Sequence, residues 1–523
     1  MSPSHASEAP VFDPLALPAA IARVREPVHV LRAPQAGPVG ISYGATPNSP
    51  YEWLGTLPAL YPEWLGDRSF SEVHGTRFPY VTGAMANGIA STDIVKAMAR
   101  AGMLGFFGSA GLTLPRIEAA VQELVREIPE LPFGCNLIHA PHEPNVEAGT
   151  VELYLRYGVR RAEAAAFMAL TLPVVRYAYS GIRRLPDGRI HRENALFAKI
   201  SRAETARRFL SPAPQEMLSA LQRLGQLSAE EVALARHLPV AEDIIVEADS
   251  GGHTDNRPLT ALFPGIAALR DTCITEFGYE RPVRVGAAGG IGTPAAVAAA
   301  FGMGAAFVVT GSVNQACLEA GTSAKSKEML CKAEMVDVTM APAADMFEMG
   351  VMVQVLRRGT LFAQRGHRLR ELYHRYNSLE EIPAAEAQKL EQEIFRAPLA
   401  EIWAGTERFF QERNPEEVQK AAADPHHRMA LVFRWYLGMA SKWAITGEPT
   451  RTMDYQIWCG PALGAFNSWV KGTFLEPASS RTVVQVARNL LEGAAVITRA
   501  GQLRSYGVPV PAAAFCFDPR PLE

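Results

Sequence analysis

The stretch EADSGGHT at 247–254, together with VRVGAAGGIG at 283–292 and FVVTGS at 307–312, decides the predicted fold. Each stretch contains or follows a short apolar run and ends in small residues, as parallel strands buried on both faces do. The Ala-rich residues 293–302 between the last two stretches predict a helix. Strand, Gly-Gly turn, helix, strand and Gly-Ser is the pattern of the last two units of a (β/α)8 barrel.

In such a barrel these last two loops form a phosphate site from bare backbone N–H groups and a helix N-terminus. Glycine is required there because a side chain would block the approach of the backbone to the phosphate. His253 follows the preceding strand, so we expect it at the barrel mouth, where reactions occur in this fold. A Gly-Gly-His turn or a Gly-rich loop alone is common in proteins without such a site; the ordered set favours function.

The series resembles the FMN-dependent barrels of the nitronate monooxygenase and bacterial enoyl reductase group. In that group the pattern E-x-x-x-G-G-H carries the active-site histidine, and the Gly-Gly-Ile and Gly-Ser segments hold the FMN phosphate. FPYVTGAMANGIA at 78–90 resembles the first strand and its flavin-contacting loop. LGFFG at 104–108 and FGCNLI at 133–138 resemble strands two and three.

Two further segments resemble one subfamily of this group. They are APAADMFEMG at 341–350 and DYQIWCGP at 454–461, and they are similar to the PfaD type, the trans-acting enoyl reductases of polyunsaturated fatty acid and polyketide synthases. The resemblance runs from about Trp64 to about Arg499. It implies a TIM barrel that binds FMN, uses NADPH or NADH, and reduces 2-enoyl thioesters on an acyl carrier protein.

Most of the predicted site residues follow from this resemblance. His253 is the expected catalytic residue, as a proton donor or as a contact to the thioester oxygen, because imidazole titrates near neutral pH. No metal ligand is predicted. The expected cofactor contacts are Ala84, Met85, Asn136, Lys199, Glu247, Gly252, Ala288, Gly289, Gly290, Gly311 and Ser312.

Three of these residues also have roles that rest on physical grounds. Asn136 carries both a donor and an acceptor, which suits the pyrimidine edge of a flavin. Lys199 would stabilise reduced flavin near its N1–O2 region, an inference from charge alone. Glu247 lies six residues before His253, so on one continuous strand both would face the same side. We expect Glu247 to be a structural carboxylate, satisfied by backbone or by Lys199.

Two other functions are open at this stage. A nitronate monooxygenase would use the same histidine as a base toward nitroalkanes, and a non-catalytic scaffold would use the fold to assemble a synthase. The chain departs from smaller enoyl reductases at TDNRPL, 254–259, and by adding a helical half. The first departure leaves the substrate contacts open, and the second favours a megasynthase partner.

Composition excludes several other classes. The 523 residues carry 51 Lys and Arg against 54 Asp and Glu, a formal charge of −3, so there is no basic field for nucleic acid. The six cysteines are scattered without a Cys-x-x-Cys pair, which favours reduced thiols. The N-terminus, Met1 to Pro14, lacks a signal pattern, so we expect a cytoplasmic protein. Residues 285–318 lack charge, but their glycines indicate a barrel core and no membrane span.

We predict four segments: an N-terminal extension at 1–66 with a possible helix at 16–25, the barrel at 67–320, a helical cap or docking domain at 321–510, and a tail at 511–523. LPDGR at 185–189 predicts a hairpin between strands four and five. Arg202, Arg207 and Arg208 are either a solvated face or a landing site for an acidic carrier protein. A homodimer is the default oligomer.

Overall fold

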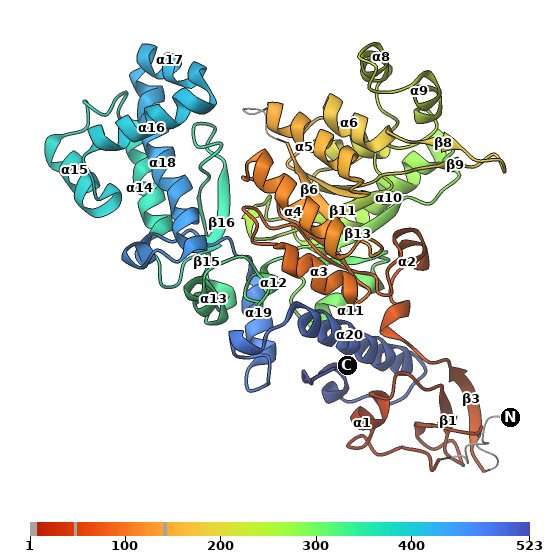
Figure 1. The fold of residues 1–523 in the computed structure, drawn as a ribbon. Coiled ribbons are helices and arrows are strands. Elements are labelled where there is room, and N and C mark those ends of the chain that lie inside the picture. Colours follow the sequence, from red (N-terminus) through yellow and green to blue (C-terminus); the bar gives the residue numbers. More distant parts are fainter. Residues whose placement is uncertain (1–7, 47–49, 140–143, 523) are drawn as a thin grey trace.

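The computed structural model describes residues 8–46, 50–139 and 144–522, and its centre is a closed barrel of eight parallel strands (Figure 1). Each strand pairs with the next along the chain, and β14 closes on β4 with Val308 opposite Tyr80. The predicted fold class is confirmed. The strands are β4 (Tyr80–Thr82), β5 (Leu104–Phe107), β6 (Gly134–Ile138), β7 (Arg161–Ala165), β10 (Ala195–Ile200), β11 (Asp243–Glu247), β13 (Arg284–Ala288) and β14 (Val308–Thr310).

Helices surround the barrel, and several of them begin at side-chain caps. Ser91 accepts from the amide of Ile94, and Thr293 accepts from Ala296, so orphan N–H groups of two helices are satisfied. The uncharged residues 285–318 fold as strand, helix and strand, as expected. The barrel helices are α3 (Thr92–Arg100), α4 (Leu114–Glu127), α5 (Pro144–Tyr157), α6 (Leu172–Tyr179), α7 (Ala203–Leu210), α8 (Gln215–Arg223), α9 (Ala229–Ala235), α10 (Leu259–Phe277), α11 (Pro294–Gly302) and α12 (Ser312–Gln315).

Aromatic rings fill the inside of the barrel. Phe70, from α2 (Arg68–His74), stacks on Phe307 with ring centroids 4.5 Å apart, and Phe106 meets Phe197 at 5.0 Å. A Cβ atom at Gly286 would lie 2.3 Å from the Phe307 ring, so only glycine leaves that ring room. The barrel is therefore a packed core that α2 closes at one end.

A buried charge network lies at the end of the barrel that α2 closes. Asp243 accepts from Arg284 Nε at 2.6 Å and lies 3.1 Å from His74 Nε2, and all three side chains are almost fully buried. Burial opposes ionisation of Asp243, but Arg284 and His74 outweigh it and lower the pKa of that carboxyl. The network fixes α2 to β11 and β13.

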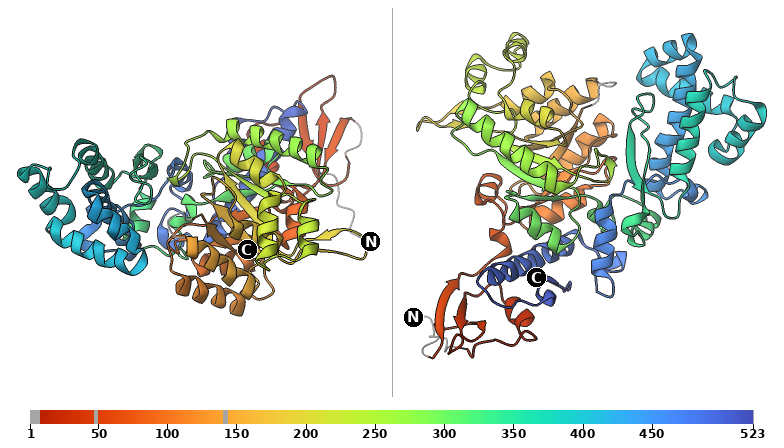
Figure 2. Two further views of the ribbon diagram at one scale, coloured as in Figure 1. Left: turned by 90° about the horizontal axis from the view of Figure 1, so that it is seen from above. Right: turned by 180° about the vertical axis from the view of Figure 1, so that it is seen from behind.

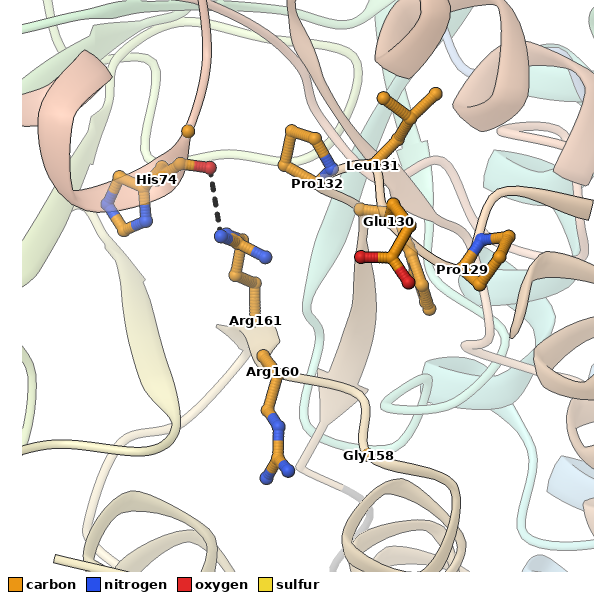
Figure 3. Close-up of a pocket in the computed structure, with 10 residues that line it drawn as sticks. His74, Pro129, Glu130, Leu131, Pro132, Gly158, Arg160 and Arg161 are labelled. Atoms are coloured by element: carbon orange, nitrogen blue, oxygen red, sulfur yellow. Dashed lines mark hydrogen bonds between the residues drawn. The ribbon is translucent and has the colours of Figure 1, made fainter.

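A small pocket of about 250 Å³ opens beside this network (Figure 3). Arg161 points toward α2 there and donates to the backbone carbonyl of His74 at 2.9 Å, while Arg160 points away. This pocket lies at the start of β7, so it is at the opposite end of the barrel from the mouth.

The N-terminal segment contains a sheet that the sequence analysis did not predict. Its strands are ordered β2-β1-β3, and the helix expected at 16–25 is shorter, α1 at Leu17–Ile21. This region packs on the long C-terminal helix (Figure 2). Arg25 pairs there with buried Glu492. The first seven residues of the Met1 to Pro14 segment lie outside the described residues. The strands are β1 (Val28–Arg32), β2 (Val39–Ser42) and β3 (Glu52–Leu57).

Residues 321–510 do not form one uniform helical body. They begin with α13 (Ala324–Cys331) and an antiparallel hairpin, β15 (Val338–Pro342) with β16 (Met352–Leu356), which we call the mouth hairpin. A bundle that we call the helical unit follows at the end of the barrel opposite α2 (Figure 1). It comprises α14 (Phe362–Arg375), α15 (Ala384–Lys389), α16 (Leu399–Arg413), α17 (Pro415–Ala423) and α18 (Pro425–Thr446).

The last two helices return to the barrel. α19 (Pro461–Val470) follows the helical unit, and α20 (Val483–Ser505) lies along α11 (Figure 2). A Cβ atom at Gly493 would lie 2.7 Å from Pro294, so glycine permits this close helix contact. The predicted Asp-Gly hairpin is confirmed as β8 (Arg183–Arg184) and β9 (Ile190–His191). In the described part of the chain, no helix has the length and apolar character needed to cross a membrane.

Replacing Arg284 by methionine is expected to lower the free energy of unfolding by about 3–5 kcal/mol, because Asp243 would lose its main counter-charge inside the barrel. Urea denaturation at neutral pH measures this loss. The control is Asp187→Asn, which breaks the exposed pair with Arg189 and is expected to leave the midpoint unchanged. An unchanged midpoint for Arg284→Met would show that the buried network does not stabilise the end of the barrel that α2 closes.

Candidate active site

A charged cluster lies at the carboxyl ends of three neighbouring barrel strands. Lys199 Nζ on β10 is 3.3 Å from Glu163 Oε1 on β7 and 3.2 Å from Glu247 Oε1 on β11. The strand register places all three side chains inside the barrel mouth. Glu163 is fully buried, and its second oxygen accepts from the backbone N–H of Ala84 at 3.0 Å. One cation therefore serves two carboxylates.

The electrostatics of this cluster follow from burial and from its unequal charges. Burial raises the pKa of Glu163, and Lys199 only partly offsets the effect. For Lys199, burial lowers the pKa, but Glu247 and Glu163 outweigh it, so its pKa is raised and the ammonium stays charged at neutral pH. Of the two partners expected for Glu247, backbone or Lys199, the structure shows Lys199, whereas the sequence analysis did not identify Glu163. The sequence feature that could have identified Glu163 is its position as the lone acidic residue in the apolar run of β7.

The predicted contacts Ala84, Met85 and Asn136 lie on or directly after strands β4 and β6, at the mouth end of the barrel. Ala84 and Met85 follow β4, and Gly108 must be glycine because a Cβ there would lie 1.7 Å from the Met85 carbonyl oxygen. Asn136 on β6 is almost fully buried, and its amide donates to the backbone oxygen of Glu163 at 3.0 Å. That donor thus joins β6 to β7, next to the charged cluster.

The two Gly-rich loops lie at the ends of β13 and β14, as predicted. Gly289 has φ +81°, and a Cβ there would lie 2.6 Å from the backbone of Ala248, so this glycine allows two loops to touch. Gly290 and Gly311 differ, because a Cβ at either position would meet no protein atom within 4 Å. Their backbones border open space. Ser312 Oγ accepts from the amide of Gly460 at 3.1 Å, which leaves its hydroxyl proton for another acceptor.

The predicted relation between Glu247 and His253 is wrong. β11 ends at Glu247, and His253 belongs to a separate short strand, β12 (Gly252–His253). This strand pairs antiparallel with β16, with Gly252 opposite Gln354. The Asp-Ser-Gly turn between the strands breaks the alternation that the period-two argument requires.

His253 lies at the rim of the mouth and contacts an acidic residue from the mouth hairpin. Its side chain is 45% exposed, and Nε2 lies 3.2 Å from Asp345 Oδ1. Partial burial opposes the imidazolium, but the Asp345 carboxylate outweighs it, so the pKa of His253 is raised above its usual value. Asp345 lies in the 341–350 segment that marked the subfamily, but the sequence analysis did not pair it with His253.

Two predicted basic residues are already paired. Arg202 binds Asp255 at 2.9 Å, and Arg207 binds Glu276 at 2.6 Å. Local carboxylates thus neutralise most of the suggested carrier-protein landing site. Among the described residues, no group of three or more His, Cys, Asp or Glu side chains is arranged to hold a metal ion.

The charged cluster predicts a pH dependence. Lys199→Met would leave Glu163 and Glu247 facing each other and raise the pKa of Glu163 further. A carboxyl group whose pKa is higher in the folded state than in the unfolded state stabilises the folded protein less as pH rises above its unfolded-state pKa, about 4.3. We expect the free energy of unfolding of Lys199→Met to fall more steeply from about pH 5 to about pH 8 than that of the wild type. The total loss should reach roughly 3–5 kcal/mol.

Urea denaturation across this pH range checks the prediction. Lys325→Met, which removes an exposed lysine paired with Glu328, is the matched control and should follow the wild type. Parallel pH curves for Lys199→Met and the wild type would contradict the assigned role of Lys199.

Comparison with known proteins places this geometry in a family. The nitronate monooxygenase family model matches residues 68–397, which include every barrel strand. A second model, the inserted helical domain of [acyl-carrier-protein] S-malonyltransferase, matches 376–455, which covers much of the helical unit.

Individual relatives align over most of the chain. A polyunsaturated fatty acid synthase polypeptide of Thraustochytrium sp. is 48% identical over 87% of this chain, and polyketide biosynthesis protein PksE of Bacillus subtilis is 43% identical over 83%. The chain spans only 31% and 56% of those two proteins.

A solved structure is similar over nearly its whole length. The enoyl reductase domain of MlnA, from the macrolactin cluster of Bacillus amyloliquefaciens, is 38% identical and superposes with a TM-score of 0.80, covering 85% of this chain and 99% of that domain. With the family model matching well over half of the residues, the chain belongs to the nitronate monooxygenase family of barrel proteins.

Proposed function

We propose that this protein is an FMN-dependent enoyl reductase that acts in trans on 2-enoyl thioesters of an acyl carrier protein, with NADPH or NADH as reductant. The observation that carries the proposal is the match to the MlnA enoyl reductase domain over 99% of that domain. The relatives from polyunsaturated fatty acid and polyketide synthesis support a role in one of those pathways.

The barrel mouth fits FMN. Open space beside Gly290 and Gly311, with the Ser312 hydroxyl, suits a phosphate bound by backbone N–H groups. Lys199 supplies an ammonium inside the mouth, shared with Glu163 and Glu247, that would contact the anionic reduced ring. Ala84, Met85, Asn136, Glu247, Gly252, Ala288 and Gly289 complete the proposed contacts. Bound FMN would supply the two-electron chemistry by which NAD(P)H is oxidised and the enoyl thioester reduced.

His253 is the proposed proton donor. Reduction of a 2-enoyl thioester requires a proton at the carbon next to the carbonyl and stabilisation of negative charge on the thioester oxygen. The imidazolium of His253 can do either from the rim of the mouth. Its partial exposure leaves access for a thioester carried on a flexible arm.

We further propose that residues 67–320 are the catalytic domain, that 321–510 serve as cap and partner-docking region, and that the protein meets a carrier protein of a larger synthase. Within 321–510, the mouth hairpin reaches the His253 strand directly. A nitronate monooxygenase activity is the second candidate, because the family model bears that description and a paired histidine can also act as a base.

Gly311→Val is expected to abolish FMN binding without unfolding the barrel. The new side chain would fill space that no protein atom occupies, at the proposed phosphate position. The measurement is flavin absorbance per mole of purified protein, with thermal unfolding of the flavin-free form alongside. Gly302→Val is the matched control, since Gly302 also borders open space but lies at the far end of α11, and it should keep FMN. Full flavin content in Gly311→Val would place the phosphate elsewhere.

His253→Ala is expected to slow enoyl reduction by roughly 10²–10⁴ while NAD(P)H still bleaches the flavin. The experiment is anaerobic: reduce the yellow protein, add a 2-enoyl thioester on a carrier protein, and follow recovery of flavin absorbance. Exposed His237→Ala is the control and should match the wild type. If flavin absorbance recovered only with oxygen or a nitroalkane, the protein would be a monooxygenase and not a reductase. If the protein bound no FMN, both enzyme functions would be rejected and the non-catalytic scaffold would remain.

A further inference from the structure

The strand that carries His253 is held by the mouth hairpin and not by the barrel. β12 pairs with β16, and Gln354 of β16 donates to Asp249 Oδ1 at 2.8 Å and to the Ser250 carbonyl at 2.7 Å. The Gln354 side chain is almost fully buried, so both bonds are shielded from water. The turn between Glu247 and His253 therefore takes its shape from a segment roughly a hundred residues later in the chain.

The same hairpin supplies the partner of the histidine. Asp345 lies in the connection between β15 and β16, and its Oδ1 is 3.2 Å from His253 Nε2. The other charges that act on His253 are Glu247, which favours the imidazolium, and Lys199, which opposes it. Glu247 is itself paired with Lys199, so Asp345 is the main counter-charge of His253.

The helical unit fixes this connection in place. Phe347 packs on Tyr373 of α14 and on Phe433 of α18, with ring centroids 5.1 and 6.3 Å apart. His367 of α14 lies 2.9 Å from the Met340 carbonyl on β15. Gly366 brings the helix against the strand, since a Cβ there would lie 3.2 Å from Pro342. Two helices outside the barrel thus set the position of Asp345.

We propose that Asp345 is a positioning residue for His253, and that the helical unit acts on catalysis by holding Asp345 on the mouth hairpin. A carboxylate at Nε2 keeps a proton on that nitrogen and leaves Nδ1 as the nitrogen available to the substrate. It also favours the imidazolium, the form that can donate a proton. This role rests on the proposed function of His253, but the contact itself is testable without substrate.

The test compares Asp345→Asn with Glu348→Gln. Both remove one negative charge from the same connection, but Glu348 pairs with Arg434, at 3.1 Å, where Asp345 pairs with His253. NMR titration of the histidine rings, with the His253 signal assigned from the His253→Ala variant, is the first readout. Asp345→Asn should move the His253 titration to lower pH, and Glu348→Gln should leave it where it is in the wild type.

The second readout is the pH dependence of kcat for enoyl reduction. A proton donor loses activity as pH rises through its pKa, so the alkaline limb of the profile should shift to lower pH in Asp345→Asn. Its kcat at the optimum should fall by less than in His253→Ala, and Asp345→Glu should restore much of the profile. A purely structural role would lower kcat without moving the limb.

The two proposals fail in different ways. Unchanged His253 titration in Asp345→Asn, or equal shifts in Asp345→Asn and Glu348→Gln, would overturn the positioning role. A shifted titration in a protein without enoyl reductase activity would keep the contact and reject the proposed function instead.

Discussion

Closure of β14 onto β4 is the constraint on which the rest of this molecule depends. A closed barrel has no sheet edge to satisfy, but its interior must be filled completely. Here the Asp243 network and packed aromatic rings fill the end of the barrel that α2 closes, and the charged cluster around Lys199 lies at the mouth. Glycines stand where a ring needs the space of a side chain, as Gly286 does beside Phe307.

Because the interior is packed, binding and catalysis are expected at the loops that follow the carboxyl ends of the strands. On one side of the mouth, the loops that contain Gly290 and Gly311 border open space. On the other sides, segments from outside the barrel support the loops. His253 is held by β16, and Ser312 bonds to Gly460, which follows the helical unit. The barrel mouth is thus completed by residues beyond the barrel.

Buried charge accompanies both ends of the barrel, with different consequences. At the end that α2 closes, Asp243 has two partners, so its ionised form is well compensated. At the mouth burial raises the pKa of Glu163, and Lys199, which Glu247 shares, only partly offsets this effect. Compensated charge suits a structural role, whereas uneven charge suits a site that must bind or stabilise a charged group.

The sequence by itself determined the barrel, its first three and last three strands and the two Gly-rich loops, because short apolar runs, glycines and their spacing are local signals. Only the tertiary structure decided that Lys199 pairs with both Glu247 and Glu163, that His253 leaves the barrel strand, and that Asp345 and Gln354 hold it. The N-terminal sheet was likewise not predicted from the sequence. These contacts join residues up to about a hundred positions apart, and no local pattern encodes which distant strand will pair with Gly252 and His253.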